Sequence, residues 1–143
     1  DLKDLLRVRE ALEGMACRLA AERLSNKEIK DLEELLEGHA RQEPLQAGDS
    51  YFQRPGDFDF HYRIIRGSGN QKLISMLIDD LYHLLRIYRY RSSARKGRAL
   101  EALQEHRAIV AAIAAHDPDR AEELMRLHLT RARQSIEADE SAE

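Results

Sequence analysis

Apolar residues recur every three or four positions along most of the chain, and no strand-like alternation of apolar and polar residues is sustained. This spacing is typical of amphipathic α-helices. The pattern predicts six helices, at about residues 5–24, 26–37, 57–66, 71–90, 98–115 and 118–136. Residues 46–56 contain Gly, Asp, Ser and Pro instead, which predicts a loop.

Three capping signals support the predicted helix starts. Ser25 and Glu28 have the spacing of a capping box, Asn70 precedes the fourth helix, and Asp117 precedes Pro118 at the first position of the sixth. Because the connections are short, we expect consecutive helices to lie antiparallel. The sequence therefore predicts an all-α fold, a single antiparallel bundle of about six helices, with residues 1–143 as one domain.

Composition narrows the class of protein. The chain has 143 residues, of which 34% are charged, with only seven Gly, three Pro and no Trp. These values exclude collagen-like, low-complexity and disulfide-scaffold proteins. No apolar run is long enough to span a bilayer, no signal peptide is recognisable, and Cys17 is the single cysteine. We therefore expect a cytoplasmic protein with no membrane contact, and its net charge of −3 does not indicate nucleic-acid binding.

Six histidines are present, and three of them occupy the apolar faces of predicted helices. His61 lies beside Phe60 and Ile64, while His106 and His128 lie among apolar residues in the middle of the last two helices. The other three histidines have positions where surface or capping roles are expected. His39 lies near the end of the second predicted helix, His83 on a polar helix face and His116 in a turn.

The three inward histidines and one aspartate suggest a metal site. Asp57 precedes His61 by four residues, so a helix beginning near Asp57 places both on one stripe. One buried imidazole is easily satisfied by hydrogen bonds, but three with a carboxylate cost several kcal/mol unless something satisfies them together. A divalent cation in the core of the bundle, bound by Asp57, His61, His106 and His128, would do so.

The chain also resembles a known family, and five groups of residues carry the resemblance. In order they are Arg9-Glu-Ala-Leu-Glu13 with Leu19-Ala-Ala-Glu-Arg23; Asp57-Phe-Asp-Phe-His61; Gly69-Asn70; Glu105-His106 with Ile109 and Ala112-Ile113; and Asp117 with Ala121, Met125 and His128-Leu129. The chain is similar over nearly its whole length to the C-terminal effector-binding (FCD) domain of the FadR subgroup of GntR-family bacterial transcriptional regulators.

The resemblance implies a ligand set and an effector. In the metal-holding members one Asp and three His bind the ion, and their motifs fall on the four residues already selected. Such a set suits Zn²⁺ first, with Ni²⁺ or Mn²⁺ as alternatives. The ion and an arginine would hold a small organic acid: a hydroxy acid, sugar acid or dicarboxylate. Arg9 is the arginine that the family pattern favours, and Arg86 is a second candidate. Asn70 either helps to bind the effector or serves only as a helix cap.

The resemblance further implies a regulator and not an enzyme. Effector binding would shift the helices of a homodimer, and the shift would reach an N-terminal winged-helix domain. Only that N-terminal domain would bind operator DNA. We expect that domain to be absent from residues 1–143. Asp1 falls about where the family's sensor domain begins, so we expect the C-terminal, effector-binding and dimerisation part of a longer protein.

Three other interpretations remain open. A metal-dependent enzyme, an oxygenase or a hydrolase, could use the same aspartate and histidines, although no additional general base or nucleophile motif is evident. The basic segment 86–98, which includes Tyr88 and Tyr90, could bind nucleic acid directly, although the net charge argues against it. Finally, the histidines could be merely hydrogen-bonded in a structural dimerisation bundle.

Overall fold

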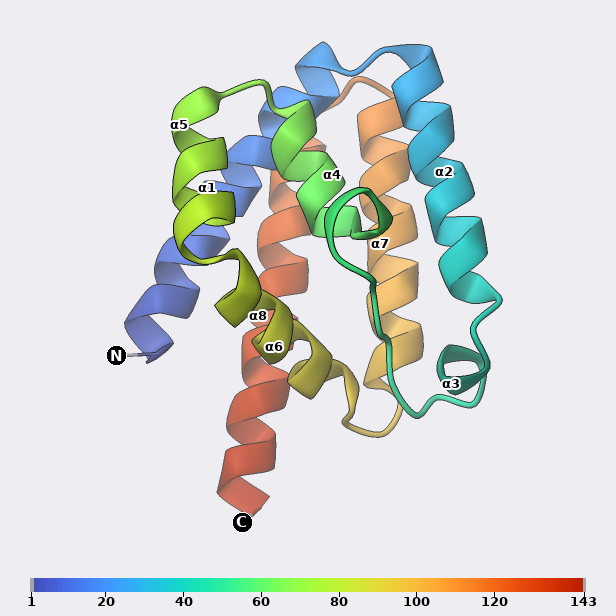
Figure 1. Ribbon diagram of the computed structural model, residues 1–143, viewed down its shortest axis with the longest axis vertical. Helices are drawn as coiled ribbons and strands as arrows, with labels where there is room; N and C mark the ends of the chain where they lie inside the picture. The colour runs from blue at the N-terminus through green and yellow to red at the C-terminus, as the bar shows by residue number, and fades with distance from the viewer. Residues whose placement is uncertain (1, 143) are drawn as a thin grey trace.

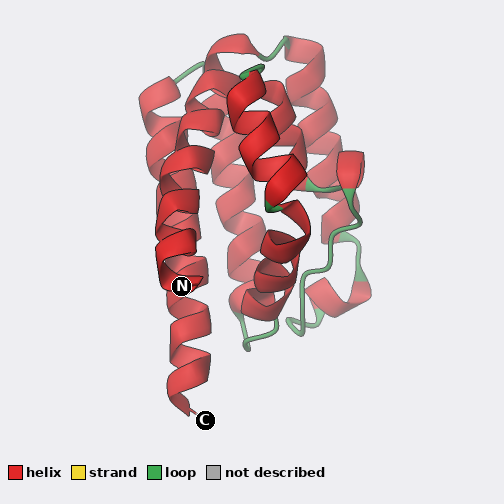
Figure 2. Cartoon of the chain, turned by 60° about the vertical axis from the view of Figure 1, so that its left-hand side comes forward, coloured by secondary structure: helices red, strands yellow, loops and turns green. Residues whose placement is uncertain are grey.

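The secondary structure is entirely helical in the residues that the computed structural model describes, the backbone of 2–142 and the side chains of 2–138 (Figures 1 and 2). Eight α-helices are present in this range: α1 (Leu2–Arg23), α2 (Asn26–Ala40), α3 (Glu43–Gln46), α4 (Phe60–Gly67), α5 (Gln71–Ile74), α6 (Tyr82–Ser93), α7 (Arg98–Ala114) and α8 (Pro118–Ala142). A 3₁₀ turn, η1 (Gly56–Phe58), precedes α4, and a π-helical segment, η2 (Ser75–Asp80), follows α5. The predicted all-α class is confirmed.

The long helices pack side by side and bury two groups of apolar residues. Helix α1 lies along α8, α7 packs against α8 and α2, and α4 packs against α1 (Figure 1). The larger group joins the second half of α1 to α2, α4, α7 and α8, and the smaller joins Leu6 and Ala16 of α1 to α4, α5, η2 and α6. Within residues 2–142, no helix combines the length and the apolar character that crossing a bilayer requires.

All three predicted caps are present. The Ser25 hydroxyl accepts a hydrogen bond from the backbone N–H of Glu28, whose carboxylate accepts from the backbone N–H of Ser25. The Asn70 side chain accepts from two backbone N–H groups at the start of α5. The Asp117 carboxylate accepts from the backbone N–H of Arg120, and α8 begins at Pro118.

Several helix boundaries differ from the prediction. Helix α4 begins at Phe60 and not near Asp57, because the Asp59 side chain caps it by accepting from the backbone N–H groups of His61 and Tyr62. The single helix predicted over residues 71–90 is divided into α5, η2 and α6, and α8 continues beyond the predicted end to Ala142. Apolar spacing does not reveal these changes, because a π-segment inserts one residue into a turn without altering which residues are apolar.

Candidate metal centre

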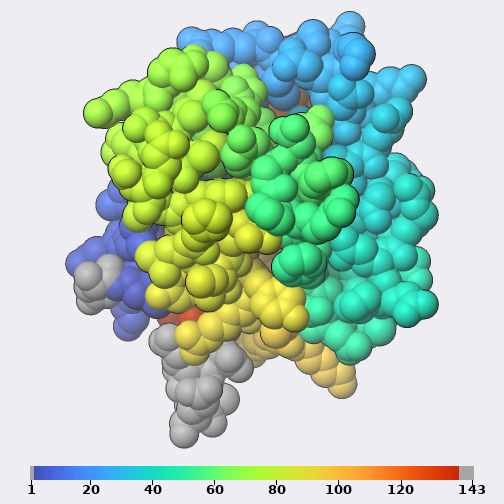
Figure 3. Space-filling model, viewed as in Figure 1, coloured from blue at the N-terminus to red at the C-terminus, as the bar shows by residue number. Residues whose placement is uncertain are grey.

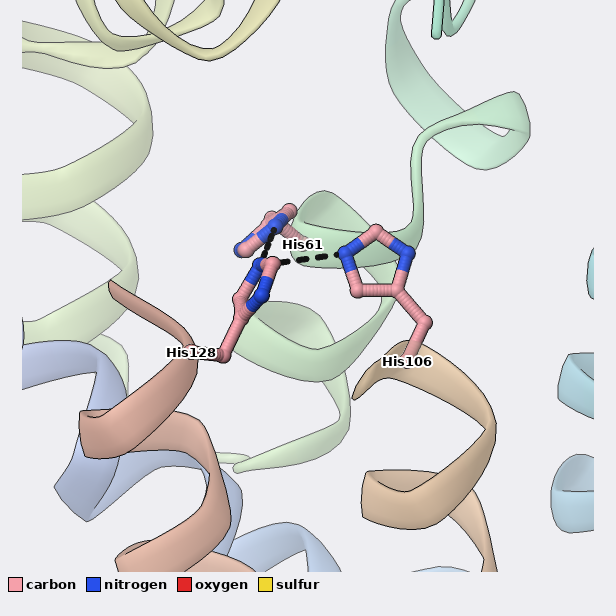
Figure 4. Close-up of side chains that lie close together, drawn as sticks. All are labelled: His61, His106 and His128. Atoms are coloured by element: carbon pink, nitrogen blue, oxygen red, sulfur yellow. Dashed lines mark hydrogen bonds between the residues drawn. The ribbon is translucent and has the colours of Figure 1, made fainter. Parts of the chain in front are cut away.

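Three buried histidines from three helices converge on one point. His61 lies in the first turn of α4, His106 in α7 and His128 in α8, and none is more than 4% exposed. Their rings face one another in Figure 4, with 3.1 Å between the Nε2 atoms of His106 and His128 and 3.4 Å between those of His128 and His61. Nitrogen ligands of a tetrahedral Zn²⁺ are separated by roughly 3.3 Å, so the spacing suits such an ion. The sequence prediction that these three side chains meet is confirmed.

Carboxylates hold the outer nitrogen of two of these rings. His61 Nδ1 lies 2.7 Å from Glu13 Oε1, and His128 Nδ1 lies 2.6 Å from Glu105 Oε1. An ionised carboxylate only accepts hydrogen bonds, so each Nδ1 carries the proton and each Nε2 presents a lone pair. The short contact between these two Nε2 atoms therefore contains no proton. Two lone pairs that face each other in a buried site are suited to a cation between them.

Arginines keep both carboxylates ionised. Arg9 pairs with Glu13, and Arg98 donates two hydrogen bonds of 2.7 and 2.8 Å to Glu105. Burial alone would raise the pKa of Glu105, but its hydrogen bonds with His128 and Arg98 lower that pKa to about 2. Burial opposes ionisation of Glu13 too, and Arg9 and His61 outweigh it, so the pKa of Glu13 lies below its ordinary value.

The three histidines are neutral at neutral pH. Burial lowers the pKa of His61 to about 4. Burial also lowers the pKa of His128, against the influence of Glu105, and it lowers the pKa of His106, with His128 adding to the effect. Neutral imidazole is the form that binds a metal ion, so this site can bind one without first releasing protons to solvent.

We expect acid to destabilise the metal-free protein. The pKa of His61 falls from 6.5 to about 4 on folding, and the pKa of Asp59 falls from 3.8 to about 2, because Arg89 outweighs the effect of burial. Both contributions to stability are complete above the unfolded pKa and are lost as pH falls through the folded pKa. The free energy of unfolding, measured by urea denaturation, should fall between about pH 6.5 and pH 2, by about 3 kcal/mol from His61 and about 2 kcal/mol from Asp59. A constant value over this range would contradict the prediction.

The third ligand, His106, is held by a different arrangement. Its Nδ1 lies 3.2 Å from the hydroxyl of Tyr51, which lies 2.6 Å from Nδ1 of His39. His39 Nε2 in turn lies 2.9 Å from the backbone carbonyl oxygen of Phe58. The expected surface or capping role of His39 is wrong: it is 5% exposed, because the end of α2 packs against Tyr51 in the loop and Phe58 in η1. Neither His39 nor Tyr51 was among the site residues expected from the sequence.

Asp57 lies outside the histidine cluster. It is exposed in η1, whereas His61 is in α4, so the two do not share a helical stripe as expected. The reason is the start of α4, three residues later than predicted. Asp59 is the buried aspartate of this motif: it is fully enclosed and its two oxygens accept bonds of 2.7 and 2.6 Å from Arg89.

A small cavity of about 30 Å³ adjoins the three histidines. Three arginines line it together with Tyr51: Arg9, Arg89 and Arg98. Among the side chains that the structure describes, Arg9 Nη2, Arg89 Nε and Arg98 Nε are buried nitrogens without a hydrogen-bond acceptor. Because a buried donor without an acceptor is costly, the cavity suits an anionic ligand.

The effector residues chosen from the sequence are only partly brought together. Arg9 lines the cavity as expected. Arg86 does not; it donates a 2.7 Å hydrogen bond to the carbonyl of Gln53, and its Nε lies 3.8 Å from the Asp59 carboxylate. Asn70 caps α5 and does not reach the cavity. Arg89 and Arg98 were not predicted from the sequence. They belong to a basic segment in which the sequence does not distinguish arginines that line the cavity from arginines that face solvent.

Other segments cover the site on the face shown in Figure 3. There, residues 41–59 and helices α4 to α6 lie over most of α7 and α8. His61, His106 and His128 are each at most 4% exposed. Any ligand larger than the cavity has to displace part of this covering.

A comparison with protein families matches residues 4–131 to the FCD domain. The match covers most of the chain, and the protein therefore belongs to the FCD domain family. FCD domains are the C-terminal effector-binding domains of GntR-type regulators, and they are regulatory and not catalytic, which agrees with the expectation that this chain is not an enzyme. A search of curated proteins found no match.

Proposed function

We propose that this chain is the ligand-sensing domain of a transcriptional regulator of the FadR subgroup, and that a core metal ion and arginines bind a small organic acid. The observation that carries the proposal is the convergence of three buried, neutral histidines whose Nε2 atoms face one another. Carboxylates orient two of these rings from behind, as is usual for histidines that bind metals.

His61, His106 and His128 would hold the ion, with Zn²⁺ as the first choice and Ni²⁺ or Mn²⁺ as alternatives. The bound ion would supply a Lewis acid with coordination positions open to a carboxylate oxygen. Asp57 stays our proposal for the fourth ligand. It is exposed on the 3₁₀ turn before α4, so that turn would have to rearrange for Asp57 to bind the ion.

Charge at the site favours an anion. The cavity's three arginines are each paired with a carboxylate, Glu13, Asp59 or Glu105, so these six groups sum to zero. A divalent ion would add a buried charge of about +2, or +1 with Asp57 as a ligand, and an enclosed net charge is costly. A hydroxy acid, sugar acid or dicarboxylate would offset it and accept hydrogen bonds from the free arginine N–H groups.

The size of the cavity links binding to a change of shape. A volume of about 30 Å³ holds one or two water molecules and not an organic acid. The acid must therefore select an opened arrangement of the covering segments, and a ligand that binds one arrangement better shifts the population toward it. In the intact cytoplasmic regulator, a homodimer of this single bundle-like domain would transmit that shift to N-terminal winged helices on operator DNA.

The proposal predicts carboxylate binding that depends on the metal. We expect zinc-loaded protein to bind at least one of lactate, gluconate and succinate in a calorimetric titration, and metal-free protein to bind it at least about 10-fold more weakly. His106→Ala should behave like the metal-free protein. The exposed His83 supplies the control, and His83→Ala should bind as the wild type does. Equal binding by wild type and His106→Ala would exclude the proposed function.

A metal-dependent oxygenase or hydrolase using the same residues is the second candidate. Such an enzyme would need a general base. Glu13 and Glu105, the carboxylates that contact the histidine rings, do not supply it, since each is already paired with an arginine and an imidazole. The basic segment 86–98 is also less available to nucleic acid than its composition indicates, since Arg98 is buried and the Arg89 side chain is only 12% exposed. Turnover of redox or hydrolysable substrates by zinc- or iron-loaded protein would favour the enzyme.

A further inference from the structure

The hydrogen bonds behind His106 form a chain with a defined end. The chain runs from the backbone carbonyl of Phe58 through His39 and the hydroxyl of Tyr51 to Nδ1 of His106. The distances along it are 2.9, 2.6 and 3.2 Å. His39, Tyr51 and His106 are each at most 5% exposed, so solvent does not compete for these groups.

The carbonyl at the end of the chain sets the direction of every bond in it. A carbonyl only accepts, so the proton of His39 sits on Nε2. Burial lowers the pKa of His39, which leaves Nδ1 of the neutral ring with a lone pair. The Tyr51 hydroxyl must then donate to His39 and can only accept from His106. His106 accordingly carries its proton on Nδ1 and presents the lone pair of Nε2 to the other histidines.

We infer that His39 and Tyr51 are positioning residues that set the tautomer of His106 and so complete the group of three Nε2 donors. This inference rests on the proposed metal site and deepens it. The alternative tautomer has a specific stabilisation that these residues must overcome: with its proton on Nε2, His106 would donate across 3.1 Å to the lone pair of His128. That hydrogen bond would occupy the Nε2 atoms of both His106 and His128, so neither could bind the metal ion.

The tautomer can be read without any metal by long-range ¹H–¹⁵N NMR of the imidazoles. In metal-free wild-type protein we expect His39 protonated on Nε2 and His106 protonated mainly on Nδ1. In Tyr51→Phe, Nδ1 of His106 loses its acceptor, so the population should move toward the Nε2–H form. His39→Phe should move it in the same direction by removing the anchor at Phe58. Tyr62→Phe, which alters a half-buried tyrosine that contacts Arg66, is the matched control and should leave it unchanged.

Zinc affinity supplies the second readout. Loss of a group that orients a metal-binding histidine typically costs 10- to 100-fold in affinity, so we expect Tyr51→Phe to weaken Zn²⁺ binding by about that factor. The inference is overturned if wild-type His106 is mainly protonated on Nε2, or if its tautomer is the same in wild type and both variants. A wild type that binds no Zn²⁺ would overturn the proposed function, while the NMR measurement would still test the hydrogen-bonded chain.

Discussion

Replacement of His106 by alanine is expected to abolish metal binding. One of the three converging Nε2 atoms is lost, and only His61 and His128 remain of the histidine cluster. Losing a ligand should weaken Zn²⁺ binding by at least about 100-fold, more than the loss of a supporting hydrogen bond. Elemental analysis before and after chelation should find one ion per wild-type chain and almost none in the variant.

Thermal or urea unfolding provides a parallel measurement. Zn²⁺ at about 100 times its Kd should stabilise the wild type by about 2.7 kcal/mol, and the gain should be missing in His106→Ala. Comparing each variant with its own metal-free form separates lost binding from the cavity that the substitution creates. Wild-type protein without metal, or His106→Ala with a full complement, would refute the site. The exposed His83→Ala should retain the wild-type metal content.

Asp57→Ala extends this comparison to the fourth ligand. If Asp57 moves inward to bind the ion, the variant should lose Zn²⁺ affinity although its side chain is exposed and outside the cluster. An unchanged affinity would leave the ion with the three histidines and ligands from solvent or the effector. The metal-free stability should be unaffected in either case, because an exposed side chain contributes little to it.

The histidines could be predicted from sequence because regular helices carry them. Along α7 and α8 the apolar faces are continuous, so the position of His106 or His128 in the repeat fixes which way the ring points. Asp57 was misplaced because its relation to His61 depends on where α4 begins, and a cap at Asp59 moves that start by a full turn. Helix ends are set by individual hydrogen bonds, which periodicity does not record.

The groups behind the ligands were largely beyond sequence reasoning. Tyr51 lies in a loop, where no repeat relates one side chain to another, and it contacts His106 across 55 positions of sequence. Arg89 pairs with Asp59 across 30 positions, and nothing in the basic run distinguishes it from its exposed neighbour Arg91. Glu105 was more accessible, because it precedes His106 and shares a helix with Arg98.

Substitution of Asp59 by alanine should have the largest effect on stability. Its carboxylate is fully buried, receives two hydrogen bonds from Arg89 and one from the Tyr82 hydroxyl, and caps α4. Removing one member of a buried ion pair leaves the other charge uncompensated, at about 3–5 kcal/mol. We expect the melting temperature of metal-free protein to fall by roughly 10 °C or more.

Two further variants identify the source of this loss. Asp59→Asn retains an oxygen that can cap α4 but has no charge for Arg89, so it should be destabilised by less than Asp59→Ala, the difference reflecting the cap. Asp57→Ala, two residues earlier and exposed, should change the free energy of unfolding by less than about 0.5 kcal/mol. If Asp57→Ala and Asp59→Ala reduced the free energy of unfolding equally, Asp59 would not be the buried aspartate of this motif. Because α4 carries His61, the loss of its cap should also weaken Zn²⁺ binding, which links the start of this helix to the geometry of the site.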